Sequence, residues 1–117
     1  MKPIFVENSK IPVWLSAVSP LDEIAAITIF PFVFSRGTID EATRNHETIH
    51  FQQYLETLVV GFLVLYLFDY LKGLKKYDDG GEAYYQIRAE QEAYEYGHEL
   101  DYLETRKRWE WLKKYEV

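Results

Sequence analysis

The sequence predicts an α+β fold that is mainly helical, and three stretches of the chain support this. Residues 24–34 are rich in β-branched and aromatic side chains, whereas residues 38–71 and 82–115 show the periodic, charged pattern of helices. The chain has 117 residues, of which 48% are apolar and 17% aromatic, enough for one compact domain over residues 1–117. A domain of this size leaves room for one functional site.

The predicted β structure is a small N-terminal sheet or hairpin around residues 24–34, I-A-A-I-T-I-F-P-F-V-F. The tripeptide Ser35-Arg36-Gly37 behind it is typical of a turn. Pro31 has no backbone N–H to donate to a neighbouring strand, so this part of the segment is predicted to lie at a sheet edge.

A long helix is predicted to follow, starting at the T-x-x-E capping box of Thr38 and Glu41 and kinked near Gly61. Its second half, Leu58 to Phe68, is apolar on every side, so it must be enclosed by other elements or by a partner. These 11 residues fall short of the ~18 to 20 that cross a bilayer as a helix, which favours a buried core helix.

The second half of the chain is predicted to add a surface connection and two more helices. Lys72 to Gly81 collects Gly, Lys and Asp and is typical of a connection. A helix is expected from about Glu82 to Tyr96, bent or ended by Gly97, and a C-terminal helix from His98 to Tyr115.

Composition excludes some classes of site and partner. The chain has no cysteine, so any metal must be held by imidazole and carboxylate groups. The formal net charge of -6 argues against nucleic-acid binding, which needs a cationic face. Met1 to Lys10 lacks the basic and long apolar order of a secretory signal, so we expect a cytoplasmic protein.

The segment H-E-T-I-H at residues 46–50 has the spacing of a metal site on a helix. His46 and His50 are four residues apart, so on a helix both imidazoles project from one face. Glu47 stands at the edge of that face, where its carboxylate can act as a general base rather than a ligand. The alternative is an ordinary helix surface, because patterns of five residues also arise by chance.

A catalytic zinc site needs a third protein ligand, and residues 84–98 offer four candidates. Glu90 lies in the middle of a weakly polar helical stripe, where a carboxylate is costly unless a cation meets it. Glu92 and Glu95 share a stripe with Arg88 that is typical of a solvated face. We therefore predict Glu90 as the ligand, with a buried salt bridge to a Lys or Arg as the alternative.

Two further residues have open roles. Tyr94 lies one helical turn from Glu90 and can point its hydroxyl toward the metal, although a core or supporting role is favoured over catalysis. His98 follows Gly97 and can be a helix cap, a core histidine or a donor to the oxyanion of the reaction.

These residues resemble the gluzincin clan of zinc metallopeptidases, in which an HExxH helix supplies two histidines and a later helix supplies a glutamate. The segment E-Q-E-A-Y at residues 90–94 is similar to the E-x-E-A-D segment of HtpX-like and prenyl-protein-processing peptidases, with Tyr94 in place of the acid. Residues 30–106 also resemble small zincin-like proteins of bacteria and their phages. The resemblance implies a zincin-like core, zinc ligation by His46, His50 and Glu90, and Glu47 as base.

The predicted function is zinc-dependent hydrolysis of peptide bonds in a peptide or protein substrate that pairs with the strand at residues 27–34. One alternative is a catalytically silent metal-binding module that engages a partner protein. Another is a small membrane-associated protein, with residues 58–68 on a membrane surface or in a homo-oligomer; membrane association is the less favoured expectation. A ferritin-like two-metal site ranks last, because only Glu47 and His50 have its Glu-x-x-His spacing.

Overall fold

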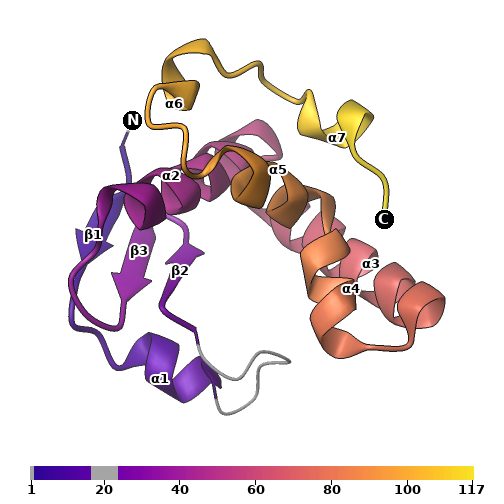
Figure 1. Cartoon of the computed structure of the whole chain (residues 1–117), viewed down its shortest axis with the longest axis horizontal. Coiled ribbons are helices and arrows are strands. Elements are labelled where there is room, and N and C mark those ends of the chain that lie inside the picture. The colour runs from indigo at the N-terminus through magenta and orange to yellow at the C-terminus, as the bar shows by residue number, and fades with distance from the viewer. Residues whose placement is uncertain (1, 17–23) are drawn as a thin grey trace.

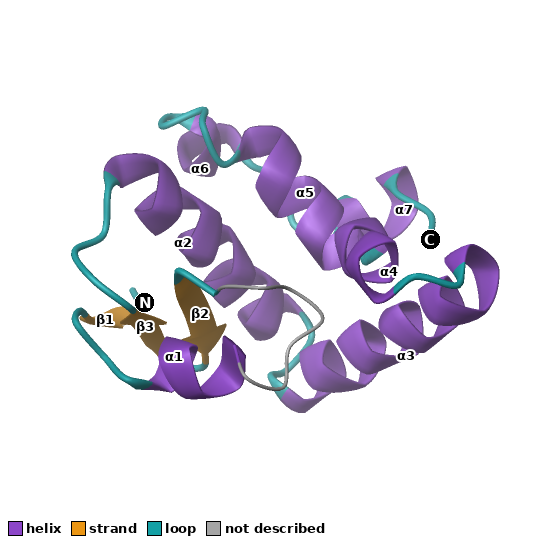
Figure 2. Cartoon of the chain, turned by 60° about the horizontal axis from the view of Figure 1, so that its bottom comes forward, coloured by secondary structure: helices purple, strands orange, loops and turns teal. Residues whose placement is uncertain are grey.

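The computed structural model describes residues 2–16 and 24–117 and confirms a mainly helical α+β fold (Figure 1). Helix α2 crosses the middle of the molecule, with a small sheet packed on one side of it and α3 and α5 on the other (Figure 2). The elements in chain order are β1 (Ile4–Val6), α1 (Ile11–Ser16), β2 (Ala26–Ile29), β3 (Phe32–Ser35), α2 (Glu41–Glu56), α3 (Val60–Tyr77), α4 (Gly80–Gln86), α5 (Arg88–Tyr96), α6 (Tyr102–Thr105) and α7 (Trp111–Lys114).

The sheet has the order β1-β3-β2, with β1 parallel and β2 antiparallel to β3. The prediction of an edge strand at Pro31 is therefore wrong for β3, which is the central strand. Pro31 lies between the two strands of the hairpin, after a cis peptide bond, and its carbonyl accepts a hydrogen bond from the N–H of Ile4. A proline is tolerated at this place because a turn residue does not need to donate an N–H hydrogen bond to a neighbouring strand.

Helix α2 is capped by Asp40 and not by the predicted box of Thr38 and Glu41. The Asp40 carboxylate accepts a 2.7 Å hydrogen bond from the N–H of Thr43, and the helix begins at Glu41. An aspartate directly before the first turn accepts a hydrogen bond from a free backbone N–H, and its negative charge is stabilised by the positive end of the helix dipole. This cap places the H-E-T-I-H segment in the second and third turns.

The long helix predicted over residues 38–71, with a kink near Gly61, is instead two helices. The chain breaks after Glu56, and α3 begins at Val60 and leaves at 111°. Leu58 and Val59 both have positive φ, at 59° and 65°, a region that β-branched residues rarely adopt. The fold offsets this strain by packing Phe62 of α3 against Tyr54 of α2, with ring centroids 4.0 Å apart. The break turns α3 back beside the histidines of α2.

Helix α3 is not the buried core helix that its apolar sequence predicted. The core is formed instead around Tyr54, Phe62, Ile87, Ala89 and Trp111. Only one face of α3 joins it, and the opposite face is exposed. Among the described residues, no single helix is long and apolar enough to cross a membrane; α2 and α3 meet that test only as a bent pair.

Three other predicted segments differ in the structure. Helix α3 continues to Tyr77, so most of the expected connection at residues 72–81 is helical. The helix expected over 82–96 is two helices, since Ile87 has an extended backbone between α4 and α5, while Gly97 caps α5 as predicted. The prediction of one C-terminal helix over residues 98–115 is wrong, because α6 and α7 are single turns. In the stretch between them, Arg106 has an extended backbone and its side chain points inward.

Candidate metal centre

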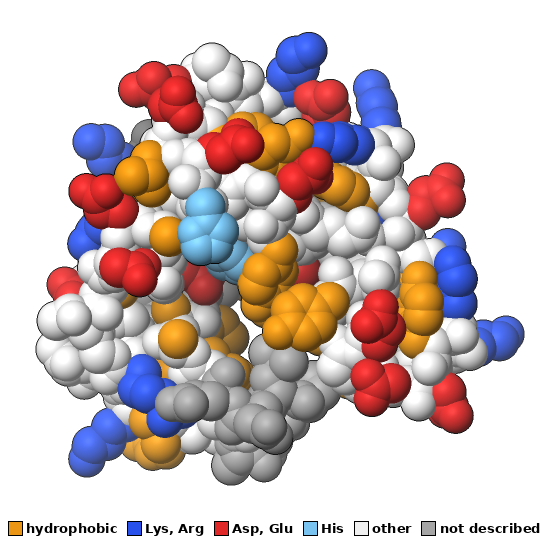
Figure 3. Space-filling model, in the orientation of Figure 1, with side chains coloured by type: hydrophobic (Ala, Val, Ile, Leu, Met, Phe, Trp, Pro, Cys, Tyr) orange, Lys and Arg blue, Asp and Glu red, His pale blue; other side chains and the backbone are white. Residues whose placement is uncertain are grey.

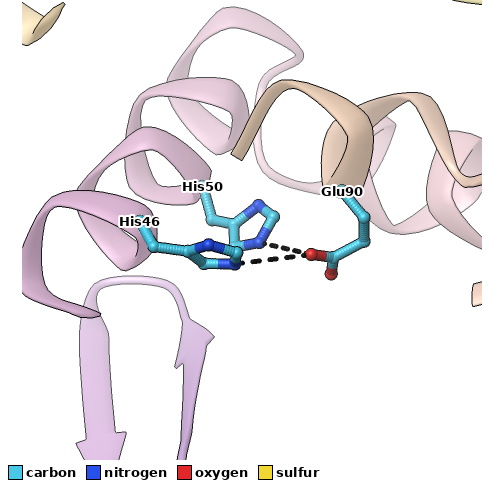
Figure 4. A group of neighbouring side chains, drawn as sticks. All are labelled: His46, His50 and Glu90. Carbon is cyan, nitrogen blue, oxygen red and sulfur yellow. Dashed lines mark hydrogen bonds and ion pairs between the residues drawn. The ribbon is translucent and has the colours of Figure 1, made fainter. Parts of the chain in front are cut away.

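The structure brings the three predicted ligands together (Figure 4). His46 and His50 project from one face of α2, and Glu90 reaches them from α5. One carboxylate oxygen, Oε1 of Glu90, lies 3.0 Å from Nε2 of His50 and 3.5 Å from Nε2 of His46. Of these side chains, His50 and Glu90 are buried and His46 is 17% exposed, so the group is open to solvent on one side.

The spacing of the three donor atoms fits a tetrahedral metal ion. Ligands bound ~2.0 to 2.1 Å from a tetrahedral zinc lie about 3.3 Å from one another. All three donor atoms of the group lie within 4.8 Å of one another, and the distances from Oε1 of Glu90 to the two histidines, 3.0 and 3.5 Å, are close to the ideal spacing. Two imidazoles and one carboxylate form a known catalytic donor set for zinc, with a fourth position left open.

Gln53 determines which nitrogen of His50 carries the proton. The amide nitrogen of Gln53 donates to the carbonyl of Ala89 and to Glu92, so its oxygen must face His50. That oxygen accepts a 2.8 Å hydrogen bond from Nδ1–H of His50. The lone pair of the neutral ring is then on Nε2, the atom that faces Glu90. Such a hydrogen bond to the outer nitrogen orients ligating histidines.

The carboxylate of Glu90 is held on both oxygens. Oε1 faces the two histidines, and Oε2 accepts a 2.5 Å hydrogen bond from the hydroxyl of Tyr66 on α3. Burial alone would raise the pKa of Glu90, but the two histidines outweigh burial and hold it well below its usual range. The salt-bridge alternative predicted a Lys or Arg here; in the described chain the partners of Glu90 are His46, His50 and Tyr66.

Without a metal, the electrostatics of the group favour a proton between the ligands. Burial lowers the pKa of His50, but the neighbouring Glu90 carboxylate has the opposite effect and raises it to about 9. The pKa of Tyr66 is raised well above its usual value, first by burial and then by Glu90, so Tyr66 remains a neutral donor. A cation that binds at Nε2 takes the place of this proton.

Glu92 is buried, and the prediction that it lies on a solvated face is wrong. Arg106 reaches in from the C-terminal segment and forms ion pairs with both Glu92 and Glu56, and all three side chains are at most 4% exposed. Glu92 also accepts hydrogen bonds from Tyr102 and from Gln53. A buried chain of contacts therefore runs from Arg106 through Glu92 and Gln53 to His50.

Arg88, which shares the predicted stripe with Glu92, pairs with another acidic residue. Arg88 forms an ion pair with the buried Asp69 of α3, at 2.8 Å. Of the other two candidate ligands, Glu95 is exposed and pairs with Lys114, while His98 is exposed at the rim of the cleft described below. Neither belongs to the ligand group.

Tyr94 supports His46 through its ring. The two ring centroids are 4.7 Å apart in an edge-to-face arrangement. Its hydroxyl lies 3.0 Å from the hydroxyl of Tyr84, so it contacts a second tyrosine and not the ligands as one expectation had it. The side chain is half exposed, which leaves Tyr94 at the entrance of the site.

Glu47 is held in place by the sheet. Its side chain is buried, and its Oε2 accepts a 2.9 Å hydrogen bond from the hydroxyl of Thr28 on β2. Thr28 lies 19 residues earlier in the chain, and its backbone carbonyl accepts a hydrogen bond from Tyr54 of α2. This pair of contacts couples the edge strand to the helix that carries the histidines.

Hydrogen bonds from one side chain join α2 to the end of α5. The side-chain amide of Asn45 donates to the carbonyls of Tyr96, Gly97 and Glu99 at the end of α5. Gly97 lies so close that a Cβ there would be 2.6 Å from a backbone oxygen of α5 and 3.4 Å from the His46 ring. Glycine is needed at this position for space, since its backbone is right-handed helical.

A cleft of about 1080 Å³ opens over the ligands, and Glu47, His46, His50 and Glu90 all line it. One wall is β2. The other is formed by one side of α3 together with tyrosines from α3, α4 and α5. In the space-filling view, histidine side chains reach the surface beside a group of apolar side chains (Figure 3). Glu47 and the group of His46, His50 and Glu90 thus face a cleft that an external molecule can enter.

Sequence reasoning missed Gln53, Tyr66, Thr28 and the inward position of Glu92. Gln53 stands three residues after His50, so helical spacing was an available signal for it; the others are reached only through tertiary contacts.

Comparisons with protein-family models, with curated proteins and with solved structures give no match for this chain. The likeness to gluzincins therefore depends on the two motif segments alone.

Proposed function

We propose that this chain is a zinc-dependent peptidase. The observation that carries the proposal is the convergence of His46, His50 and Glu90 on one point of an open cleft, with the Glu47 carboxylate from the same helix lining it. Two imidazoles and one carboxylate are ligands of catalytic zinc, and the same donor set also binds Fe(II). The carboxylate of Glu47, next to the first ligand in the chain, supports a hydrolytic metal and therefore zinc. When bound, zinc polarises a carbonyl oxygen and lowers the pKa of water toward about 7.

Glu47 acts as the general base and then as the acid. Its Oε2 is occupied by the Thr28 hydroxyl, which leaves Oε1 to accept a proton from the attacking water. The same carboxylate then returns the proton to the leaving amine. Thr28 positions the carboxylate and does not touch the reacting atoms.

Among the described residues no strand pairs with the outer edge of β2, and this edge is the expected docking site for an extended substrate. The carbonyl of Thr28 bonds to Tyr54 and so points away from β3, and in an antiparallel pair every second residue faces the same way. The N–H of Thr28 and both backbone groups of Ala26 then face the cleft side. A peptide that pairs with these groups is bound with little dependence on its side chains.

Metal analysis and a cleavage assay test this function. We expect about one zinc per chain in the wild type, lost in His50→Ala and Glu90→Ala. Glu47→Gln should retain zinc but lower cleavage of an unfolded protein substrate about 10²- to 10⁴-fold. Glu41→Gln, an exposed change on the same helix, is the matched control.

Each alternative result has a distinct meaning. A folded wild type without bound metal overturns the metal site. Zinc without cleavage overturns the peptidase and identifies a silent metal-binding module. Cleavage that survives in Glu47→Gln excludes Glu47 as the base.

A further inference from the structure

The outer face of α3 carries an apolar surface that the metal site does not account for. Six side chains at helical spacing are between 54% and 68% exposed. They are Val60, Leu63, Val64, Leu67, Phe68 and Leu71, and we call them the α3 outer stripe. They cover 12 residues, or ~18 Å of helix. Contiguous apolar surface of this kind marks an interaction site in soluble proteins.

The stripe ends in positive charge. Beyond Leu71, the exposed Lys75 continues this face and the exposed Lys72 lies at its edge. Lys76 lies toward the opposite side of α3, where its ammonium donates to the carbonyl of Val117. The single acid of α3, Asp69, is buried on the opposite face in its ion pair with Arg88. The exposed face of α3 is therefore apolar and cationic, although the chain as a whole has a net charge of -6.

We propose that the α3 outer stripe binds the surface of an anionic lipid bilayer. Apolar side chains beside lysines are the features by which interfacial helices enter the boundary between headgroups and acyl chains. The long stems of the lysines extend their ammonium groups to the phosphates while the stripe is buried. The acidic remainder of the molecule is repelled by the same surface, so the charge distribution orients the protein with α3 down.

The helix lies along the membrane. Its inner face packs on the protein through Phe62, Asp69 and Gly73, all of them buried, so lipid cannot surround it. Leu63 and Leu67 line the cleft as well as the stripe, whereas Val64 and Phe68 do not line the cleft. The cleft entrance is thus next to the bound surface.

A second copy of the chain is a poorer match for this face. Parallel pairing of two stripes would bring Lys72 and Lys75 of each copy together. Antiparallel pairing would place them beside Val60, where the exposed face of the helix offers no acid. Charge therefore favours a lipid surface over self-association.

Vesicle flotation tests the proposal with the full-length chain. We expect binding to phosphatidylcholine vesicles that contain roughly 30% phosphatidylserine and weak binding to phosphatidylcholine alone. The double change Val64→Gln and Phe68→Gln should lower the partition coefficient about tenfold or more. Lys72→Gln with Lys75→Gln should lower it about 25-fold. Lys2→Gln with Lys10→Gln, which neutralises two exposed lysines far from α3, is the control.

Zinc content and circular dichroism confirm that each variant is folded. The proposal is overturned if the folded wild type does not bind anionic vesicles, or if the Val64 and Phe68 changes leave binding intact. It is also overturned if the wild type is a dimer that does not bind vesicles and the Val64 and Phe68 changes convert it into a monomer. That last result would assign the stripe to a second copy.

Discussion

Replacing Gln53 with methionine tests whether its amide holds the ring of His50 for metal binding. Gln53 is fully buried, and methionine has a similar unbranched shape, so the change removes polar contacts without a large cavity. Three hydrogen bonds are lost, those to His50, Ala89 and Glu92. The outer nitrogen of His50 then has no acceptor to orient it.

The expected loss has two parts that are measured separately. Each hydrogen bond contributes about 1 kcal/mol, so the metal-free variant should lose about 2 to 4 kcal/mol of unfolding free energy in urea. Loss of a contact that orients a ligating histidine lowers metal affinity about 10- to 100-fold. A competitive titration of zinc against a chromophoric chelator measures this on the folded protein. Gln86→Met, which removes a surface contact to Glu82, is the control.

A folded Gln53→Met protein that binds zinc within about twofold of the wild type would refute the reasoning. Such a result would mean that packing alone orients His50. If stability falls and affinity does not, Gln53 serves only the buried network with Glu92.

Three more changes have predicted outcomes. Arg106→Met leaves two buried carboxylates uncompensated and should cost about 3 to 5 kcal/mol in urea unfolding, while the exposed Arg108→Met should cost under about 0.5 kcal/mol. Gly97→Ala forces a backbone shift at the end of α5 and should cost about 1 to 3 kcal/mol and weaken zinc binding; equal stability would contradict the close approach. In chelator, the raised pKa of His50 gives stability that is fully present below about 6.5 and lost as the pH rises through about 9. The lowered pKa of Glu90 gives stability that is present above about pH 4.5 and lost as the pH falls. The unfolding free energy measured in urea should therefore be highest between about pH 4.5 and 6.5. Zinc affinity should rise about tenfold per pH unit up to pH ~9, because the ion replaces the His50 proton, and a pH-independent affinity would contradict this.

The sequence by itself determined those features of the site that depend on local helical geometry. His46 and His50 share a face because they are four residues apart, and Glu90 was separated from Glu95 by its place on a stripe. The mainly helical class followed from the same periodicity. For Glu92 this reasoning failed, because a charged stripe is solvated only if no distant arginine covers it, and Arg106 does.

Only the tertiary structure decided the contacts between segments far apart in the chain. The break at Leu58 and Val59 carries no proline or glycine at those positions, and strained backbone there persists because Phe62 packs on Tyr54. The apolar run of α3 predicted burial, yet burial depends on how many other elements are present to cover a helix. In a chain of 117 residues they cover one face, and the other remains exposed. Periodicity reports which side chains share a face, whereas the partner of that face depends on packing across the whole fold.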